Sequence, residues 1–447
     1  MTSIARQAIV IGAGMGGLSA AAAVAPFFDR VTVLERDALP SEPAWRIGTP
    51  QCSHIHALLL GGLEALGELV PGLSEDLERA GAVPFNTTRD AWYEFPNLPP
   101  LVRDVGLPSA YSMTRPLLEH TVRRRIESLG NVEIRDRRRV HSLTSAGNRV
   151  TGVRIGGDPG EALAADLVID CSGRGAPTLD LLRELGQTPE EDVVGCNLSY
   201  ATVLVAKPDG WVDDWLGVTT FAGPPDDHKG SFVYSVENRC WMATLNEMHG
   251  EDPPETWETF LAAAKTLHTP TFYDAVSAGR PMSDVMRFRR PTSTLRHFER
   301  LAAFPQGLIA LGDVICQFNP VYGQGMTVAA QEARLLRRLL VDRSTKPHPL
   351  AGLAEAFFAA TPQITQFPWA YSNGYDFAFP ETTGSRPPVD AAAAAFSAAL
   401  TELVRRDADV HRLLMEVNFC LKPPTVYQDP ALMARVMSVA AELRATA

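Results

Sequence analysis

A glycine-rich segment near the N-terminus constrains the fold of this chain more than any other feature. Residues 8–11 are continuously apolar, as a buried parallel strand requires, and a glycine-rich run follows at residues 12–17. Residues 18–27 are rich in alanine and compatible with a helix, and residues 31–34 form a second apolar run that ends in Glu35. The order strand, glycine turn, helix, strand predicts a Rossmann-like β-α-β unit.

This turn fits the G-x-G-x-x-G pattern of dinucleotide-binding folds. Glycines there allow a tight turn and close approach of a pyrophosphate, whose charge the N-terminus of the following helix stabilises. Glu35 lies 23 positions after Gly12, where an acidic side chain would accept hydrogen bonds from the adenosine ribose. The residues of this unit predicted to contact the cofactor are Gly12, Gly14, Met15, Gly16, Gly17, Glu35 and Arg36.

A second glycine-containing segment indicates which dinucleotide binds. Residues 307–311 are an apolar strand that ends in Gly312 and Asp313, and a loop containing proline and glycine then opens a helix. An acidic residue at a strand end before such a loop suits the ribityl and flavin half of FAD. Backbone N–H groups around Gly325 and Met326 would face the flavin N1/C2 carbonyl, where negative charge collects on reduction. The predicted cofactor is FAD, and the flavin-adjacent candidates are Asn319, Pro320 and Gly323.

Composition excludes several other classes of protein. The chain has 447 residues, of which 45% are hydrophobic and 21% charged, an ordinary globular composition. Its net charge of −11 argues against a nucleic-acid partner. The six cysteines form no C-x-x-C pair, which favours reduced thiols in a cytoplasmic protein. Glycines interrupt the apolar stretch 8–28, so we expect neither a membrane span nor a signal peptide.

Together these motifs resemble those of FAD-dependent monooxygenases of the aromatic-hydroxylase type. The resemblance is carried by residues 12–17, Glu35, residues 170–175, the pair Gly312-Asp313 and residues 319–326. Residues 46–59, with the sequence RIGTPQCSHIHALL, narrow it to the flavin epoxidases of bacterial polyether biosynthesis, such as the lasalocid and monensin epoxidases.

The resemblance covers about residues 8–340, and it has departures. Val203 stands where that group tends to have arginine, and Ala176 replaces a small hydroxyl residue. The last hundred residues carry no motif that matches. These departures leave the predicted FAD unaffected and put the identity of the substrate in doubt.

The resemblance implies roles for three further residues. Arg115 matches an arginine that opens a helix and holds the flavin, and Arg46 and Gln51 belong to a loop that runs along the flavin in the family. His54 and His56 form an H-x-H pair, but no third ligand accompanies them at a suitable spacing, so we predict no metal site.

The predicted fold is α/β: a FAD-binding Rossmann-like domain of the glutathione-reductase type, an inserted antiparallel-sheet substrate domain and a helical C-terminal region. Residues 198–248 alternate aromatic, β-branched and polar residues between turn signals, which indicates antiparallel strands. The FAD-binding domain is assigned to residues 1–85, 111–190 and 296–345. The substrate domain is assigned to residues 86–110 and 191–295, and the helical region to residues 346–447, with loop breaks at 347–349 and 379–388.

The reaction implied by the resemblance is monooxygenation. Reduced flavin and O₂ give a C4a-hydroperoxide whose distal oxygen is electrophilic. No base that could ionise a phenol stands out, which favours epoxidation of an alkene-bearing natural product in bacterial secondary metabolism over the alternative, hydroxylation of an aromatic or heteroaromatic ring. Aromatic residues that could line a pocket for a small apolar substrate are Trp92, Tyr93, Phe221, Tyr234, Trp241 and Phe318, although packing in the core is the favoured role for each one taken singly.

Three other functions share this fold. Flavin halogenases depend on a lysine in the N-terminal part of the flavin domain, and no lysine precedes Lys207, which argues against halogenation. A reductase of isoprenoid chains stays open as an alternative. A non-catalytic flavin-binding protein ranks last, because residues 319–326 are intact. No second G-x-G-x-x-G follows a strand, so electrons would come from NADPH that binds transiently or as reduced flavin from a partner reductase.

Overall fold

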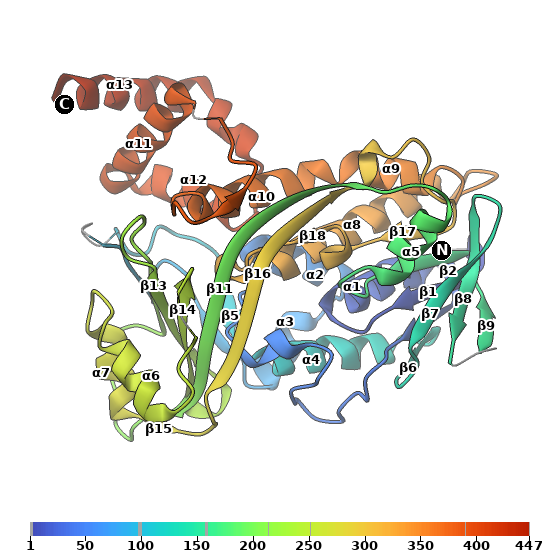
Figure 1. Cartoon of the computed structure of the whole chain (residues 1–447), viewed down its shortest axis with the longest axis horizontal. Helices are drawn as coiled ribbons and strands as arrows, with labels where there is room; N and C mark the ends of the chain where they lie inside the picture. Colours follow the sequence, from blue (N-terminus) through green and yellow to red (C-terminus); the bar gives the residue numbers. More distant parts are fainter. Residues whose placement is uncertain are drawn as a thin grey trace.

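A parallel sheet lies at the centre of the first domain. The computed structural model describes residues 3–96, 101–156, 160–212, 214–250, 252–388 and 390–446 (Figure 1). In sheet order the five strands are β17 (Leu308–Ala310), β10 (Leu167–Asp170), β1 (Ala5–Ile11), β2 (Phe28–Leu34) and β6 (Val132–Arg135). The predicted buried strands are confirmed, and β1 and β2 each begin three residues before the apolar runs 8–11 and 31–34.

Helix α1 (Met15–Val24) follows β1 and differs from the predicted span of 18–27. It begins earlier because the carbonyl of Gly14 already accepts the N–H of Leu18. It ends earlier because Pro26 has no N–H to continue the ladder, so Ala25–Phe27 forms a 3₁₀ turn. Helix α1 packs against α2 (Leu60–Leu69), α4 (Arg115–Glu127) and α8 (Gln324–Arg343).

A three-stranded antiparallel sheet and a late helix complete this core. Strands β7 (Val140–Ala146), β8 (Arg149–Ile155) and β9 (Glu161–Ala164) form the sheet, and β8 packs against β10. Helix α9 (Leu353–Ala360) adds Phe357 and Phe358 to the same buried cluster. Part of the segment predicted as a separate C-terminal region therefore belongs to the core of the first domain.

Two long strands join the first domain to the second. Strands β11 (Glu190–Ala206) and β16 (Met286–His297) pair antiparallel and run along the length of the molecule (Figure 1). Their sheet continues through β14 (Cys240–Met248), β13 (Lys229–Val236), β12 (Gly217–Thr220) and β4 (Ala91–Glu94). The predicted antiparallel strands of residues 198–248 are confirmed, although β4 pairs with β12 in parallel.

The C-terminal helices α11 (Ala391–Arg406), α12 (Ala408–Asn418) and α13 (Pro430–Thr446) stand at one end of the molecule (Figure 1). They follow α10 (Pro362–Asp376) and pack on one another through a cluster that includes Leu403, Val404 and Val436. The predicted loop 379–388 contains a short strand, β19 (Thr383–Gly384), that pairs with β11. None of the described helices is both long enough and apolar enough to cross a bilayer.

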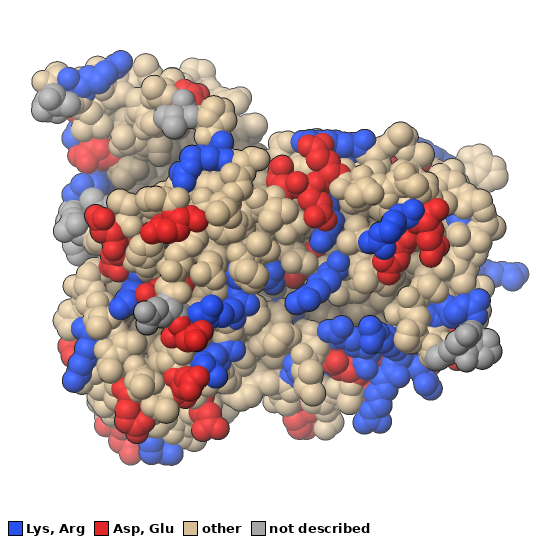
Figure 2. Space-filling view, in the orientation of Figure 1, with Lys and Arg blue, Asp and Glu red and all other residues tan. Residues whose placement is uncertain are grey.

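Charged side chains of both signs are interspersed over the face of the molecule shown in Figure 2. Three consecutive arginines, Arg137, Arg138 and Arg139, line a hollow of about 260 Å³ beside β8. This local concentration of positive charge contrasts with the net charge of −11 of the whole chain.

Candidate cofactor and substrate site

The three glycines of the first turn, Gly12, Gly14 and Gly17, differ in how much space a side chain would have. A Cβ on Gly12, whose φ is +98°, would lie 2.8 Å from the carbonyl oxygen of Cys171, and one on Gly17 would lie 1.8 Å from the carbonyl oxygen of Gly12. The fold of the chain itself requires glycine at these two positions. A Cβ on Gly14, the N-cap of α1, would meet no described atom within 4 Å. Space is therefore open at Gly14, at the N-terminus of a helix.

A buried ionic network extends from the end of β2. The Oε2 atom of Glu35 accepts the N–H of Ala13 at 2.8 Å and lies 3.3 Å from Nη1 of Arg46. The same Nη1 lies 3.1 Å from Asp37, and Nε of Arg46 donates to Glu119 at 2.9 Å. Burial alone would lower the pKa of Arg46, but the carboxylates of Glu119, Glu35 and Asp37 outweigh it and raise that pKa. Arg46 is therefore a fixed buried cation.

The network continues through Glu119 to α8. Arg115 donates from Nη2 to Oε2 of Glu119 at 3.0 Å and from Nη1 to Sδ of Met326 at 2.8 Å. Burial favours a raised pKa for Glu119, yet the charges of Arg115 and Arg46 prevail and lower it. Glu35, Arg46, Arg115 and Met326, each predicted separately, are thus brought together. Sequence analysis missed Glu119, although its i,i+4 spacing from Arg115 on a helix is a usable signal.

Several polar atoms around this network lack partners. Nη2 of Arg46, Nε of Arg115 and Oγ of Ser172 are buried without a hydrogen-bond partner among the described residues. Buried donors left unpaired cost about 1–3 kcal/mol each, so native proteins rarely retain them without a ligand or water. Together with the open space at Gly14, these guanidinium and hydroxyl donors suit an anionic, oxygen-rich ligand. The residues present therefore fit the predicted FAD.

The other predicted cofactor residues lie at different distances from the network. The side chain of Arg36 is 58% exposed and donates to the carbonyl of Gly48, so the structure does not bring it into the buried network. Gln51 lies in a 3₁₀ turn, Pro50–Ser53, within residues 46–59, which we call the Arg46 loop. Oδ1 of Asp313 is 3.8 Å from the position that a Cβ on Gly325 would take, which places these two residues side by side.

The turn that precedes α8 holds the three flavin-adjacent candidates. Oδ1 of Asn319 accepts the N–H of Val321 at 3.1 Å, which caps the 3₁₀ turn Pro320–Tyr322. Gly323 follows in the left-handed region, with a φ of +66°, and is the N-cap of α8. Nδ2 of Asn319 donates to Asp376 of α10, a residue that sequence analysis did not single out because no motif surrounds it.

His54 and His56 connect the Arg46 loop to the second domain. Nδ1 of His54 is 2.8 Å from Oγ1 of Thr202 on β11, and that hydroxyl is 2.8 Å from the hydroxyl of Thr244 on β14. Nδ1 of His56 donates to the carbonyl of His54. Burial lowers the pKa of His54 to about 4, and burial with the charge of Arg115 lowers that of His56 to about 3. Both imidazoles are therefore neutral at physiological pH.

The contact from His54 identifies one face of the second sheet as the face toward the Arg46 loop, and we call it the inner face. Side chains alternate along a strand and cross-strand partners share a face. The register therefore places these residues on the inner face of β4, β12, β13 and β14: Ala91, Tyr93, Gly217, Thr219, Gly230, Phe232, Tyr234, Val236, Cys240, Met242, Thr244, Asn246 and Met248. None of them is charged, whereas the same face of the neighbouring strand β16 carries Arg290, which lies opposite Leu198 of β11.

The opposite, outer face of the sheet packs against α6 (Trp257–Ala264) and α7 (Thr271–Ala278). Trp92 and Trp241 belong to that packing, and Phe318 belongs to the core of the first domain. Packing in the core, the role that sequence analysis favoured for each aromatic taken singly, is therefore confirmed for these three residues. Phe221 stacks on Phe95, with 4.4 Å between the two ring centroids.

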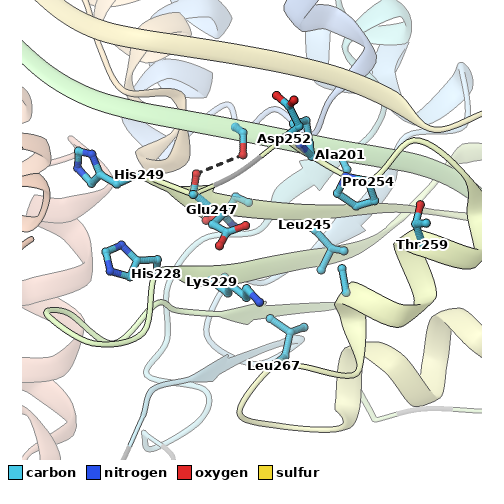
Figure 3. Close-up of a pocket in the computed structure, with 16 residues that line it drawn as sticks. Ala201, His228, Lys229, Leu245, Glu247, His249, Asp252, Pro254, Thr259 and Leu267 are labelled. Carbon is cyan, nitrogen blue, oxygen red and sulfur yellow. Dashed lines mark hydrogen bonds between the residues drawn. The ribbon is translucent and has the colours of Figure 1, made fainter. Parts of the chain in front are cut away.

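A cavity of about 650 Å³ also opens on the outer face (Figure 3). Ser199 and Ala201 of β11 line it together with Leu245 and Glu247 of β14 and Thr259 of α6. Since Thr202 contacts His54 on the inner face, the sheet separates this cavity from the Arg46 loop. The cavity is thus not part of the site described above.

Comparison with known proteins decides the family. A family model described as FAD binding domain matches residues 5–345. This chain belongs to the FAD binding domain family. Protein Rv3254 of Mycobacterium tuberculosis (strain ATCC 25618 / H37Rv) is 33% identical over 401 residues, which are 86% of this chain and 82% of that protein. Squalene epoxidase 6 of Arabidopsis thaliana is 26% identical over 368 residues, 79% of this chain and 63% of that protein.

The structure of PqsL from Pseudomonas aeruginosa shares the fold, with a TM-score of 0.61 and 16% identity over 84% of this chain and 97% of that one. The family membership confirms the predicted FAD cofactor and the class of FAD-dependent monooxygenase. The family match ends at residue 345, so α9 to α13 lie beyond it. The narrower resemblance to polyether epoxidases stays a prediction.

Proposed function

We propose that this FAD-dependent monooxygenase inserts one atom of O₂ into an uncharged, alkene-bearing natural-product intermediate and releases an epoxide. The observation that carries the proposal is the uncharged inner face of strands β4, β12, β13 and β14. An ionised substrate group would need a paired charge in such a place, whereas a hydrocarbon chain needs none. The match to squalene epoxidase 6 supports the same reaction type.

The rings of the inner face suit an extended apolar substrate. Tyr93, Phe232 and Tyr234 are partly exposed, whereas Val218 and Val233 on the outer face are fully buried. The hydroxyl of Tyr234 is already paired with that of Thr219 at 2.9 Å. Burial keeps the pKa of Tyr93 well above its ordinary value, so its hydroxyl stays neutral. These residues would hold an alkene by contact with their rings and would exclude water from it.

Residues of this chain would bind and orient the cofactor. FAD, when bound, supplies the redox chemistry and the activation of O₂. The Gly14 turn and the N-terminus of α1 hold the pyrophosphate, and Glu35 accepts hydrogen bonds from the ribose. Arg46 and Arg115 hold the flavin from the side of the Glu119 network. The N-terminus of α8, at Gly325 and Met326, stabilises negative charge on the flavin ring.

Incubation with candidate polyenes and aromatics under ¹⁸O₂, with NADPH and a flavin reductase supplied, tests the reaction. We expect one ¹⁸O atom in an epoxide or in the diol derived from it, and no product from protein that has been stripped of FAD. Label on an aromatic ring would replace epoxidation by the alternative, ring hydroxylation. A product that gains two hydrogens and no oxygen would show a reductase.

The electron source needs a separate measurement. Anaerobic rapid mixing of the FAD-loaded protein with NADPH bleaches the flavin absorbance if NADPH reduces it directly. If the absorbance persists until a flavin reductase is added, a partner protein supplies reduced flavin. Either result leaves the proposed oxygen insertion to the isotope experiment.

A further inference from the structure

Asp376 is a buried carboxylate that contacts the turn preceding α8. It lies outside the residues that the family model matches. It is the last residue of α10, thirty-one positions beyond the end of the family match at residue 345, and it is 0% exposed. One of its oxygens, Oδ1, accepts from Nδ2 of Asn319 at 2.9 Å and from the hydroxyl of Tyr322 at 2.8 Å. A single atom therefore tethers both ends of the turn.

The turn is held from its other side by the Arg46 loop. A Cβ on Gly323 would lie 2.8 Å from Cβ of Ala57, so the backbone of the turn approaches that loop closely. The turn leads directly into the first residues of α8, which include Gly325 and Met326. Asp376 on one side and Ala57 on the other thus fix where α8 begins.

We propose that Asp376 is a positioning residue for FAD: the carboxylate of the C-terminal region holds the Asn319–Gly323 turn in the conformation that receives the flavin ring. This inference rests on the proposed placement of the flavin beside that turn. The C-terminal region, which carries no matching motif, would thereby contribute to cofactor binding through the turn that it holds.

The surroundings of the carboxyl group make its role measurable. Its second oxygen, Oδ2, is buried without a hydrogen-bond partner among the described residues. Burial raises the pKa of Asp376 to about 6, while the hydrogen bonds from Tyr322 and Asn319 oppose the shift. The carboxyl group therefore changes its charge within a pH range in which flavoproteins can be handled.

The other titratable groups nearby belong to α10, β11, β16 and the loop after β14. Tyr371 and Tyr375 of α10 lie against Tyr322, and burial raises the pKa of both. Cys196 and Tyr200 on β11 feel the charge of Asp376, and Arg290 of β16 acts on the same two residues. Burial raises the pKa of Cys196 to about 11 and keeps that of Tyr200 well above its ordinary value, so neither ionises near pH 6. His249, in the loop after β14, is within hydrogen-bond distance of Thr382, and Thr382 donates to the backbone carbonyl of Asp376.

Two variants separate positioning from a merely structural role. Titration of the apoprotein with FAD, followed by flavin fluorescence, should show that Asp376→Ala weakens binding by at least about tenfold, since two charge-assisted bonds are lost. Asp376→Asn keeps an oxygen that accepts both bonds and should bind within about threefold of wild type. Circular dichroism and thermal melting of both apoproteins establish that they fold.

The visible spectrum of bound FAD between pH 5 and 8 provides a second readout. Wild type should show a transition near pH 6, because a charge next to the turn changes the surroundings of the flavin, and Asp376→Asn should show none. Tyr322→Phe removes a donor to the charged form and should move the transition to higher pH. Asp409→Asn changes a carboxylate that is 86% exposed on α12 and should behave as wild type.

Wild-type FAD affinity in Asp376→Ala, or a transition that survives in Asp376→Asn, would overturn the inference. A Gly14→Val variant run in parallel distinguishes this failure from a wrong placement of the cofactor. If Gly14→Val also retains FAD, the proposed cofactor site is wrong. If Gly14→Val loses FAD and Asp376→Ala does not, only the role of Asp376 is wrong.

Discussion

The two turns that precede α1 and α8 are stabilised in different ways. The turn before α1 is shaped by backbone against backbone, because Gly12 lies against the carbonyl of Cys171 and Gly17 against that of Gly12. The turn before α8 is shaped by side chains from distant parts of the chain, Ala57 on one side and Asp376 on the other. Both lead into a helix whose N-terminus faces the candidate cofactor site.

The difference explains why only one turn is fully visible in the sequence. A turn that requires close backbone contacts requires glycine at fixed spacing, and that spacing is a recognisable motif. A turn that is held by a distant carboxylate requires only one acidic residue somewhere in a helix. No fixed spacing in the sequence identifies such a residue. A motif can therefore be complete in the sequence although a side chain that holds it in place is not recognised.

The largest effect should come from Gly14→Val. Glycine at this position is not required by the protein's own packing, since a Cβ there meets nothing described within 4 Å. A branched side chain would instead occupy the space proposed for the pyrophosphate, so we expect loss of FAD with the fold intact. Absorbance at 450 nm of the purified protein measures the occupancy.

Gly67→Val is the matched control, because Gly67 of α2 is also a position at which a Cβ meets nothing described within 4 Å. It should retain FAD and keep a stability close to that of wild type, because valine has a slightly higher helix propensity than glycine. Gly17→Val should fail to fold, since its Cβ would collide with the backbone. A yellow Gly14→Val protein would show that this turn does not hold the cofactor.

Sequence analysis therefore succeeded where local rules determine structure. The β-α-β unit, the antiparallel strands and Glu35 could be named from local patterns, whereas Arg46 and Arg115 came only from the family resemblance. The cofactor roles of these three residues stay predictions. Glu119, the common partner of the two arginines, was missed although its i,i+4 spacing from Arg115 could have identified it. The tether Asp376 could not be named in advance, because its role depends on which elements meet in space. Trp92 and Trp241 lie in core packing, the role favoured from the sequence, but the face of the sheet on which they lie could not be predicted, since aromatic content does not say which face is covered by helices.

Asp313→Ala should produce the next largest effect on FAD binding. It tests the turn that precedes α8. Asp313 lies beside Gly325 at the start of α8, and burial raises its pKa while Arg290, Arg115 and Arg296 oppose the shift. A carboxylate that binds ribityl hydroxyls contributes about 1.5–3 kcal/mol, so FAD affinity should fall by roughly tenfold to a hundredfold. The circular dichroism of the apoprotein should match wild type, and unchanged affinity would contradict the assigned role.

The smallest effect on FAD binding should come from the carboxylates that anchor the strands beside the two turns, because they are expected to act on stability. Glu35 accepts the N–H of Ala13 and has Arg46 as a counter-charge, whereas Glu332 of α8 accepts the N–H of Gly312 at 2.6 Å and forms no ion pair among the described residues. Burial raises the pKa of Glu332 from 4.5 to about 8, with the bond from Gly312 opposing the shift. Glu332 should therefore be protonated in the folded protein at neutral pH.

The sign of the resulting pH dependence follows from linkage. A carboxyl group whose folded pKa lies above its unfolded pKa contributes stability that is full below pH 4.5 and is lost as the pH rises through about 8. The loss is on the order of 5 kcal/mol for a shift of this size, at about 1.4 kcal/mol per pKa unit. Glu332→Gln cannot ionise and should lack this loss, although its buried amide, placed where Oε1 has no partner among the described residues, should cost about 1–2 kcal/mol at every pH. Thermal melting at pH 5, 7 and 9 should therefore show the variant less stable than wild type at pH 5 and more stable at pH 9, whereas parallel curves would mean that Glu332 is already ionised in the folded protein.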